Sequence, residues 1–340
     1  MIIRVSQFKQ SSISIILFIT EVSTINQSKP RLSIGMPVFN GEKYIRSAID
    51  SILGQTYEDF ELVISDNAST DDTESICLDY KARDSRIRYQ RSKENVGAPP
   101  NYNRVFLLSK GQYFKWAAHD DVMAPTYLEK CMKVLENDSS IVLCQSKVGR
   151  IDEDGEIVGN WDEWTLKNIG SSRPHERFAD MISWRNTGLT LMGVVRTECL
   201  AKTPLHGYYL GADLNLTAEL SLMGRVHEIQ EYLFFRRDHG QAYSNMYNAL
   251  ARYEFNSPVR DYRKQLAWWG VKKKDFLSGL PRWKSLLEYF RSVNRVPLSF
   301  IEYLLCNKAM CRWLFFNSKS LLIDLINEFQ LWRFRLHYGK

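Results

Sequence analysis

The sequence has only six cysteines, and their spacing argues against a metal centre or a disulfide framework. They are Cys77, Cys131, Cys144, Cys199, Cys306 and Cys311. None stands in a C-x-x-C pair, and no pair of histidines lies nearby at zinc-ligand spacing. Four of the six lie inside apolar segments, so we expect buried free thiols in a reducing, cytoplasmic compartment.

Long apolar runs are also missing, since a membrane-spanning helix needs about 20 apolar residues. The run at Ile13–Thr20 is too short to span. Arg4 and Lys9 precede it as in a signal peptide, but no small-residue cleavage site follows. We expect residues 1–30 to be a poorly ordered lead, or the result of an upstream start site.

Two glycine-rich motifs that bind phosphates do not occur. No G-x-G-x-x-G follows the first predicted strand, so a dinucleotide fingerprint is absent. No G-x-x-x-x-G-K-[ST] occurs anywhere, which excludes a P-loop protein. A nucleotide would have to be held by side-chain carboxylates and a metal ion.

Charge is distributed unevenly along the 340 residues, whose formal net charge is +6. The segment Ala251–Lys340 holds 17 lysines and arginines against 7 aspartates and glutamates, a net charge of +10, and 18 of the 43 aromatic residues. Its short amphipathic helices fit a membrane surface, and they equally fit a bundle packed on the rest of the chain or on a second subunit. No nucleic-acid-binding motif accompanies the basic residues.

Strands and helices alternate from residue 32 onward, which predicts an α/β fold with a mostly parallel sheet and helices on both faces. The predicted strands are Leu32–Val38, Phe60–Ser65, Arg86–Gln90, the stretch that begins at Gly111, and Ile141–Gln145. Further along, Asp154-Gly155 predicts a hairpin, 161–185 a loop-rich segment, Leu189–Val195 another buried strand and Gly207–Gly224 a helix. In that helix we expect Glu219 to be a surface carboxylate.

Polar residues gather where three of the strands end. Asn40 and Glu42 follow the first strand, Asp66 and Asn67 the second, and His119, Asp120 and Asp121 the fourth. In a parallel sheet these strand ends lie at the same edge. Ligands of such sheets bind outside the carboxyl ends of the strands. Two adjacent carboxylates raise each other's pKa unless a cation lies between them, and Mg²⁺ binds through one or two carboxylates plus substrate phosphates. The alternative is a solvated acidic turn.

Five segments together resemble the family 2 glycosyltransferases. They are SIGMPVFNGEKYI, ELVISDNASTDDT, ENVGAPPNYN, FKWAAHDDVMAP and GADLNLTAELSLMGRVHEI, which span roughly Arg31–Ser244. The resemblance implies a GT-A fold, with a Rossmann-like sheet over 31–245. It fades beyond Ser244, and the pattern of apolar, aromatic and basic residues predicts a helical C-terminal region over 246–340. The resemblance also implies a nucleoside diphosphate sugar donor, Mg²⁺ or Mn²⁺, and transfer of the sugar with inversion.

The resemblance also assigns roles to single residues. Pro37, Asn40 and Glu42 would border the nucleotide pocket, Asp66 would contact the base with Asn67 beside it, Asn95 and Gly97 would shape the far wall, Asp120 would face the ribose and Asp121 the metal. Asp213 falls on the catalytic base. The chain departs from the family in Ala212, where a carboxylate is usual, and in His119 at the first position of the D-x-D motif.

The chemistry of these residues leaves some alternatives open. Sugar transfer with inversion needs one carboxylate to take the acceptor's proton, and Asp213 is a candidate for this role, but it could also be a helix N-cap. Arg236, Arg237 and His239 could meet diphosphate oxygens or form a solvated basic turn. We expect His119 to be an ordinary strand-end histidine rather than a metal ligand.

These observations favour an inverting hexosyltransferase-type enzyme of surface or extracellular polysaccharide synthesis. Its acceptor would be a glycan or a lipid-linked molecule. We expect the protein in the cytoplasm or, as a peripheral protein, at the cytoplasmic face of the membrane. A sugar nucleotidyltransferase is a weaker alternative, because MPVFNGEKYI lacks the glycine-rich loop with arginine that such enzymes use. A non-catalytic membrane-associated subunit is another, to which Ala212 lends weight.

Overall fold

The computed structural model describes residues 29–160, 166–183, 186, 188–209, 211–240, 277 and 280–338. The expectations for the N-terminal lead therefore lie outside the described residues, apart from Lys29 and Pro30. So do those for most of 246–279 and for part of the loop-rich segment 161–185.

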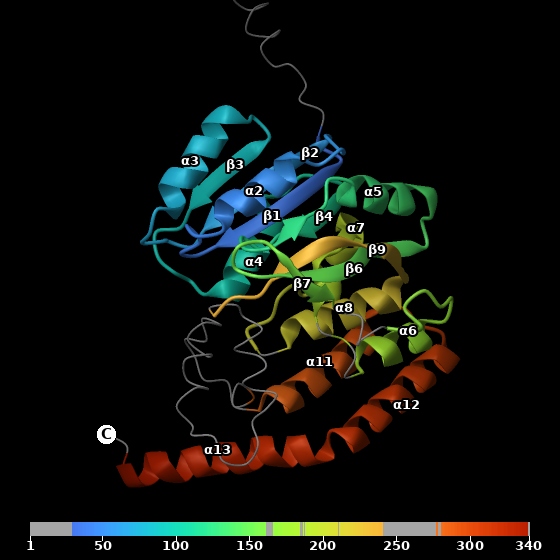
Figure 1. Ribbon diagram of the computed structural model, residues 1–340. Coiled ribbons are helices and arrows are strands. Elements are labelled where there is room, and N and C mark those ends of the chain that lie inside the picture. Colours follow the sequence, from blue (N-terminus) through green and yellow to red (C-terminus); the bar gives the residue numbers. More distant parts are fainter. Residues whose placement is uncertain are drawn as a thin grey trace, which may run out of the picture.

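The first half of the chain alternates between strands and helices as predicted (Figure 1). The elements are β1 (Leu32–Val38), α2 (Ile45–Leu53), β2 (Phe60–Asp66), α3 (Thr73–Arg83), β3 (Ile87–Arg91), α4 (Ala98–Leu108), β4 (Tyr113–Trp116), β5 (Val122–Met123) and α5 (Tyr127–Asn137). Strand β1 pairs in parallel with both β2 and β4, and β2 pairs in parallel with β3. The parallel α/β arrangement is thus confirmed.

The second half extends the same sheet and makes it mixed. Its strands are β6 (Ile141–Ile151), β7 (Ile157–Asn160), β8 (Val194–Arg196) and β9 (Arg225–Arg237). The order is β3-β2-β1-β4-β8-β6-β9-β5, with β7 on β6 as the predicted hairpin. The long pairing of β6 with β9 is parallel, whereas β8 runs antiparallel to both of its neighbours.

The prediction of one buried strand over Leu189–Val195 is wrong. Residues Leu189–Met192 form a 3-10 turn, and only Val194–Arg196 joins the sheet. The Met192 carbonyl accepts hydrogen bonds from the buried Lys115 ammonium and from the Tyr127 hydroxyl, at 3.1 Å for the tyrosine. These bonds hold the backbone in a turn, which an apolar run alone does not reveal.

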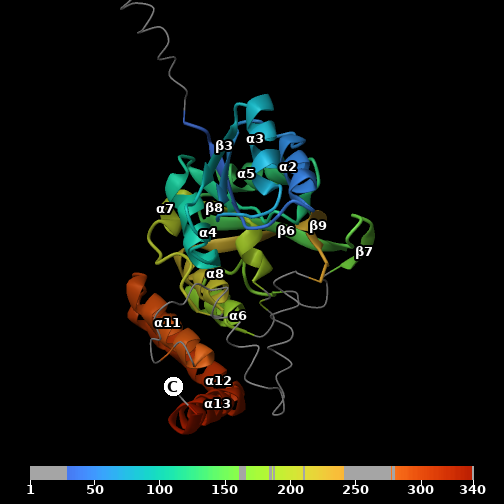
Figure 2. The same cartoon turned by 90° about the vertical axis from the view of Figure 1, so that its left-hand side faces the viewer.

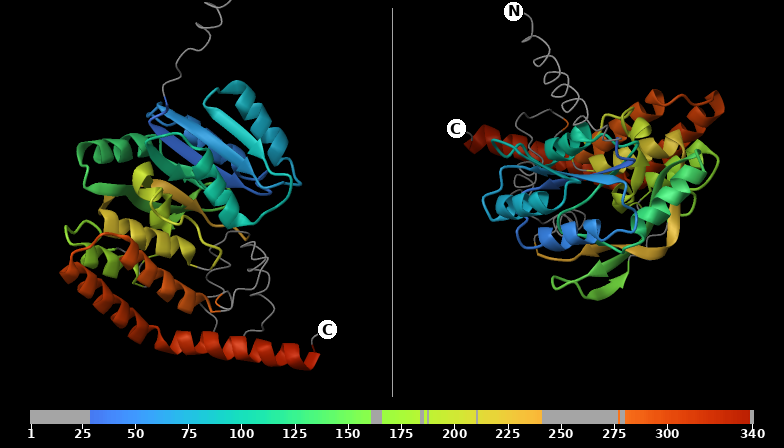
Figure 3. Two further views of the ribbon diagram at one scale, coloured as in Figure 1. Left: turned by 180° about the vertical axis from the view of Figure 1, so that it is seen from behind. Right: turned by 90° about the horizontal axis from the view of Figure 1, so that it is seen from above.

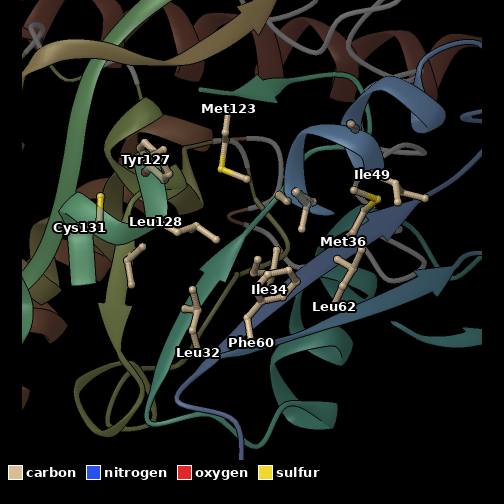
Figure 4. Packing of buried hydrophobic residues seen from close by; sticks show 14 of the residues in the cluster. Leu32, Ile34, Met36, Ile49, Phe60, Leu62, Met123, Tyr127, Leu128 and Cys131 are labelled. Atoms are coloured by element: carbon tan, nitrogen blue, oxygen red, sulfur yellow. The ribbon is translucent and has the colours of Figure 1, made fainter. Parts of the chain in front are cut away.

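Two hydrophobic clusters lie on opposite faces of the sheet, and the period-2 alternation of β4 separates them. Tyr113 and Ala117 join the cluster under α2 and α5, while Phe114 and Trp116 join the cluster under α4, α6 and α8. Figure 4 shows side chains of β1 and β2 packed together in the first cluster. Each fully buried aliphatic side chain contributes about 1.5–3 kcal/mol, so both faces hold the site's strands in place.

Helices cover the second face in layers. They are α6 (Pro174–Met181), α7 (Thr197–Leu200), α8 (Ala212–Met223), α11 (Pro281–Arg295), α12 (Phe300–Phe316) and α13 (Ser318–Tyr338). Helix α11 contacts α8 on one side and α12 and α13 on the other, and the last two run along the side of the molecule away from the sheet (Figures 2 and 3). This C-terminal region is helical, as predicted, but its helices are long.

The expectation that Glu219 lies at the surface is wrong. Its side chain is buried in α8, where it accepts hydrogen bonds from the Ser292 hydroxyl (2.6 Å) and the Arg295 guanidinium of α11. The cover supplied by α11 buries this carboxylate, and the pattern of α8 alone gives no sign of that helix.

Candidate active site

The loops after β1 and β2 are tied together by the polar residues predicted there. Asn40 has a φ of 51°, and its Oδ1 accepts a hydrogen bond from the Thr70 backbone N–H at 2.8 Å. Glu42 accepts one from the Asp72 backbone N–H at 2.9 Å. Pro37 lies on β1 beside Ser65 of β2, so it shares this edge of the sheet. These bonds give both loops a defined shape.

Asp66 ends β2 and is fully buried. Its Oδ1 accepts bonds from the Ser69 N–H (2.8 Å) and hydroxyl (2.6 Å), and its Oδ2 from the Tyr89 hydroxyl (2.7 Å) and Arg91 Nε (3.3 Å). An ionised carboxylate has about four lone-pair sites, so the protein already uses this one fully. A bound nucleobase would have to share or replace one of these donors.

Asn67 connects the loop after β2 with the loop before α4. Its amide nitrogen donates to Asn95 Oδ1 (2.8 Å) and to the Gly97 carbonyl (3.1 Å), and its oxygen accepts from the Val96 N–H (3.0 Å). Gly97 has a φ of 89°, which favours glycine at the entrance to α4. Asn67, predicted beside the base, therefore forms one network with Asn95 and Gly97, the predicted residues of the far wall.

The acidic pair after β4 meets the end of β9. Pairing of β5 with β9 brings Asp120 within 2.9 Å of His239, from Oδ2 to Nε2, while Asp121 Oδ1 accepts the Arg237 backbone N–H at 3.0 Å. Burial tends to raise the pKa of Asp120, but the imidazoles of His119 and His239 outweigh it and leave that pKa below its ordinary value. Burial, and then the charge of Asp120, raise the pKa of Asp121.

The Arg237 side chain donates its hydrogen bonds to other groups of the protein. Its side chain is buried, and it donates to the Asp120 carbonyl (2.9 Å), to the carbonyls of Asp152 (3.0 Å) and Glu153 (3.1 Å) and to the Ser47 hydroxyl (3.2 Å). The guanidinium lies 4.9 Å from the ring centroid of Tyr44, whose ring is also 4.8 Å from that of His239. Arg237 thus joins the acidic pair to the β6–β7 hairpin and to α2. No pattern in the sequence indicates these roles of Tyr44 and Ser47.

Asp213 is the second residue of α8, and the alternative that it is the N-cap is wrong. The N-cap is Gly211, with a φ of 84°, and no side chain caps the helix. Burial raises the pKa of Asp213, and none of the described lysines, arginines or histidines lowers it. A carboxylate with a raised pKa and no cationic partner is suited to accept a proton.

Asp213 is seated by residues that the sequence did not single out. A Cβ at Gly188, which has a φ of 80°, would lie 2.5 Å from Asp213 Oδ2. Asn186 accepts the Gly188 N–H (3.0 Å) and donates to the Thr217 hydroxyl (3.1 Å), which in turn donates to the Asp213 carbonyl (3.2 Å). Asn186 and Gly188 lie about 25 residues before the carboxylate in the chain, so no local pattern could have revealed them.

The three predicted carboxylates act on one aromatic side chain. Burial raises the pKa of the Tyr102 phenol, and Asp120, Asp121 and Asp213 raise it further through their negative charge. Tyr102 on α4 thus senses the charge of all three carboxylates. His119 lies against the loop after β1, since a Cβ at Gly41 would meet its ring at 2.7 Å.

These residues suit a hard divalent cation whose remaining ligands come from the substrate. Among the described residues, no three acidic, histidine or cysteine side chains converge on one point. Asp120 nevertheless lies within 2.9 Å of His239, and burial together with the charge of Asp120 raises the pKa of the neighbouring Asp121. Mg²⁺ and Mn²⁺ sites of this kind use one or two carboxylates together with substrate phosphates, so the residues fit such a metal.

The fold and the site define a GT-A-like α/β protein with its polar residues at the carboxyl edge of the sheet. The family profile "Glycosyl transferase family 2" matches residues 33–191, and the chain belongs to this family through that region. The predicted resemblance is thereby confirmed.

Similar proteins support the same assignment over part of their length. An uncharacterised glycosyltransferase of Rickettsia prowazekii is 40% identical over 122 residues, which cover 35% of this chain and 37% of that protein. The chondroitin synthase of Escherichia coli is 32% identical over 137 residues, 40% of this chain and 20% of the synthase. The chain thus spans well under two thirds of the length of these relatives.

A solved structure shares the fold. The crystal structure of residues 1–349 of S. aureus TarS in complex with UDP-GlcNAc superposes with a TM-score of 0.52 at 15% identity. The superposition covers 84% of this chain and 80% of that one. At this identity the likeness establishes the fold alone.

Proposed function

We propose that the protein transfers a sugar from a nucleoside diphosphate sugar to a hydroxyl acceptor with inversion at the anomeric carbon. The observation that carries the proposal is Asp213, a carboxylate with a raised pKa and no cationic partner among the described residues, whose charge acts on Tyr102 together with those of Asp120 and Asp121. The match to a chondroitin synthase, and UDP-GlcNAc on the same fold in TarS, support a nucleotide-sugar donor and a role in polysaccharide synthesis.

In this proposal the reaction is a single displacement. Asp213 accepts the proton of the acceptor hydroxyl, whose oxygen attacks the anomeric carbon from the face opposite the diphosphate. The bond between that carbon and the diphosphate oxygen breaks, and the nucleoside diphosphate leaves with the electron pair. When bound, a divalent cation stabilises the negative charge of the leaving group.

The remaining residues bind and orient the donor. Asp66 and Asn67 are proposed for the nucleobase side, with Asn40, Glu42 and Pro37 on one border and Asn95 and Gly97 on the far wall. Asp121 is proposed for the metal and Asp120 for the ribose, and the contact of Asp120 with His239 makes that pair a second candidate for the metal. Arg236 remains a proposal for the diphosphate. Because Arg237 is engaged within the protein, we propose that it positions the acidic pair.

The replacement Asp213→Asn tests the proposal. It should lower kcat by about 10²- to 10⁴-fold, the usual contribution of a general base, and leave donor affinity nearly unchanged. In the wild type, turnover should increase as the pH rises through the raised pKa of Asp213, because only the ionised carboxylate accepts a proton. The Asn variant should show no such rise. Glu198→Gln, which removes an exposed first-turn carboxylate from α7, is the matched control and should keep wild-type turnover.

Turnover of Asp213→Asn within about threefold of the wild type would remove Asp213 from the mechanism. A non-catalytic subunit that has kept the fold would instead bind the donor and show no turnover in any variant. Hydrolysis of the donor without acceptor, measured with and without Mn²⁺, separates this alternative from a transferase.

A further inference from the structure

Helices α12 and α13 expose an unusual amount of apolar surface. Single exposed hydrophobic residues are normal on a protein surface, but larger contiguous patches mark interaction sites. Here nine large hydrophobic side chains are exposed on two consecutive helices, and several are at least half exposed. They form what we call the apolar face of α12–α13: Phe300, Ile301, Leu304, Leu314, Phe315, Phe316, Leu322, Leu325 and Phe329.

The spacing of these residues gives each helix one outward side. Phe300, Leu304 and Phe315 of α12 recur at helical intervals, as do Leu322, Leu325 and Phe329 of α13. The buried residues of α12 are Cys306 and Met310, which point toward the second hydrophobic cluster of the protein. One apolar side of α12 therefore packs against the rest of the protein, whereas a second apolar side faces solvent.

The exposed charge beside this face is positive. Lys308, Arg312 and Lys319 are exposed and lie within one turn of the apolar residues. The three acidic residues between Phe300 and Phe329 are held inward or partnered. Glu302 binds His175, Asp324 is buried in an ion pair with Arg282, and Glu328 has a partner within the chain.

An apolar pocket opens beside the face. It lies between α11 and α12, has a volume of about 470 Å³, and is lined by Trp283, Leu287, Phe290, Met310 and Leu314 among others. Leu314 belongs both to the pocket and to the apolar face. Its lining suits a hydrocarbon chain and offers little to a polar ligand.

We propose that the apolar face of α12–α13, with Lys308, Arg312 and Lys319, docks on an anionic lipid surface. Helices with apolar residues on one side and basic residues along the flank lie in the plane of such an interface, and the α12–α13 pair has this form. No helix among the described residues is long and apolar enough to cross a bilayer, so the contact lies on the surface. The pocket accepts part of one acyl chain.

The charge favours lipid over a second copy of the chain. A symmetric dimer through this face would place the same cations of both copies near one another, which costs free energy. Anionic headgroups instead neutralise them.

Co-sedimentation of the full-length protein with vesicles tests the proposal. The protein should bind vesicles that contain phosphatidylglycerol and bind far less to phosphatidylcholine alone. Replacing Lys308, Arg312 and Lys319 by Gln should weaken binding by roughly 100-fold, since each cation near an anionic surface contributes about fivefold. Replacing Leu304, Phe315 and Leu322 by Ser should weaken binding to the same vesicles even at low salt.

Matched variants carry equal changes elsewhere on the surface. Lys81, Lys133 and Lys202 are exposed cations far from these helices in sequence, and their replacement by Gln should leave binding unchanged. Replacement of Leu78, Leu107 and Ile157 by Ser serves the same purpose for the apolar change.

Three results would overturn the proposal. They are no binding to anionic vesicles, equal binding by the face and control variants, and equal binding to both kinds of vesicle. Sedimentation velocity without lipid adds a fourth. A dimer that dissociates in the Leu304, Phe315 and Leu322 variant, with no vesicle binding by the wild type, would assign the face to a second copy.

Discussion

The position of the Asp213 carboxylate depends on the absence of a side chain at Gly188. With a Cβ there only 2.5 Å from Oδ2, either the carboxylate or the turn would have to move. The Asn186–Thr217 bonds hold this turn against the first turn of α8. A shift of the base by about 1 Å is enough to cost roughly 100-fold in rate, so this seat matters for the proposed chemistry.

We predict that Gly188→Ala lowers kcat by at least roughly tenfold while donor affinity changes little. The substitution also strains a backbone with a φ of 80°, at about 1–2 kcal/mol. Gly155→Ala is the control, because Gly155 has a φ of 96° but its added Cβ would meet only Arg237 Nη1, at 3.6 Å. Both variants should lose similar stability in urea unfolding, and only Gly188→Ala should lose turnover. Equal turnover in the two variants would contradict the idea that Gly188 positions the Asp213 carboxylate.

For single residues, the sequence reveals which residue types stand at the strand ends. It reveals little about the residues from distant segments that contact them. Asp66, Asp120 and Asp121 were found because each follows an apolar strand. The roles of Asn186 and Thr217 arise from contacts between separate segments. Lys115 is hidden in another way, because a single lysine in an aromatic strand gives no hint that burial lowers its pKa to about 8 and that it lies over the rings of Tyr127 and Phe234.

Among the elements, those with a clear hydrophobic period were predicted well. Strands β1 and β2 match their predicted ranges closely, since their apolar residues follow one period from end to end. Strand β6 runs six residues beyond its predicted end at Gln145, to Ile151. Its second half is only partly buried, and pairing with β9 rather than an apolar pattern extends it. The 3-10 turn before β8 also differs from the prediction, because hydrogen bonds from distant residues rather than the apolar pattern determine its conformation.

Helices α8 and α11 are joined by a buried carboxylate. Glu219 has 2% of its side chain exposed, whereas its partner Arg295 has 34% exposed, and the second oxygen of Glu219 has no partner among the described residues. Because α8 also carries Asp213, this contact links the C-terminal helices to the candidate site. Removing one partner of such a pair costs more than removing both, since it leaves a buried charge unpaired.

We therefore predict that Arg295→Leu destabilises the protein by about 3 kcal/mol, and that adding Glu219→Leu restores part of that loss. Glu219→Leu alone should cost less than Arg295→Leu, because the freed arginine can reach water. Equilibrium urea unfolding of the four members of this double-mutant cycle measures the coupling. Arg83→Leu, which breaks an exposed pair with Asp79, should change stability by no more than about 0.5 kcal/mol. A double variant less stable than Arg295→Leu would contradict the prediction.

In the whole molecule, the candidate site draws on both sides of the sheet. The loops after β1 and β2 belong to the side covered by α2 and α3, while Asp213 stands on α8 in the layer covered by α11. The acidic pair follows β4, which contributes side chains to both hydrophobic clusters. A donor that contacts the first loops and the acidic pair would therefore be bound by segments that follow three different strands of the sheet.

Thermal unfolding with UDP and Mn²⁺ tests this arrangement. A ligand that binds only the folded state stabilises it by RT ln(1 + [L]/Kd), about 2.7 kcal/mol at a hundredfold excess over Kd. For a domain of this size that corresponds to a rise in Tm of roughly 5–10 °C. UDP alone should give a smaller rise, because Asp120 and Asp121 leave the diphosphate facing two carboxylates with no cation between them.

Asp121→Ala should abolish the difference between UDP with and without Mn²⁺. Asp154→Ala, at an exposed hairpin position, should keep it. If the Mn²⁺-dependent part persists in Asp121→Ala and disappears in Asp120→Ala or His239→Ala, the metal belongs to the Asp120–His239 contact instead. If Mn²⁺ makes no difference in the wild type, the acidic pair holds no metal for this nucleotide.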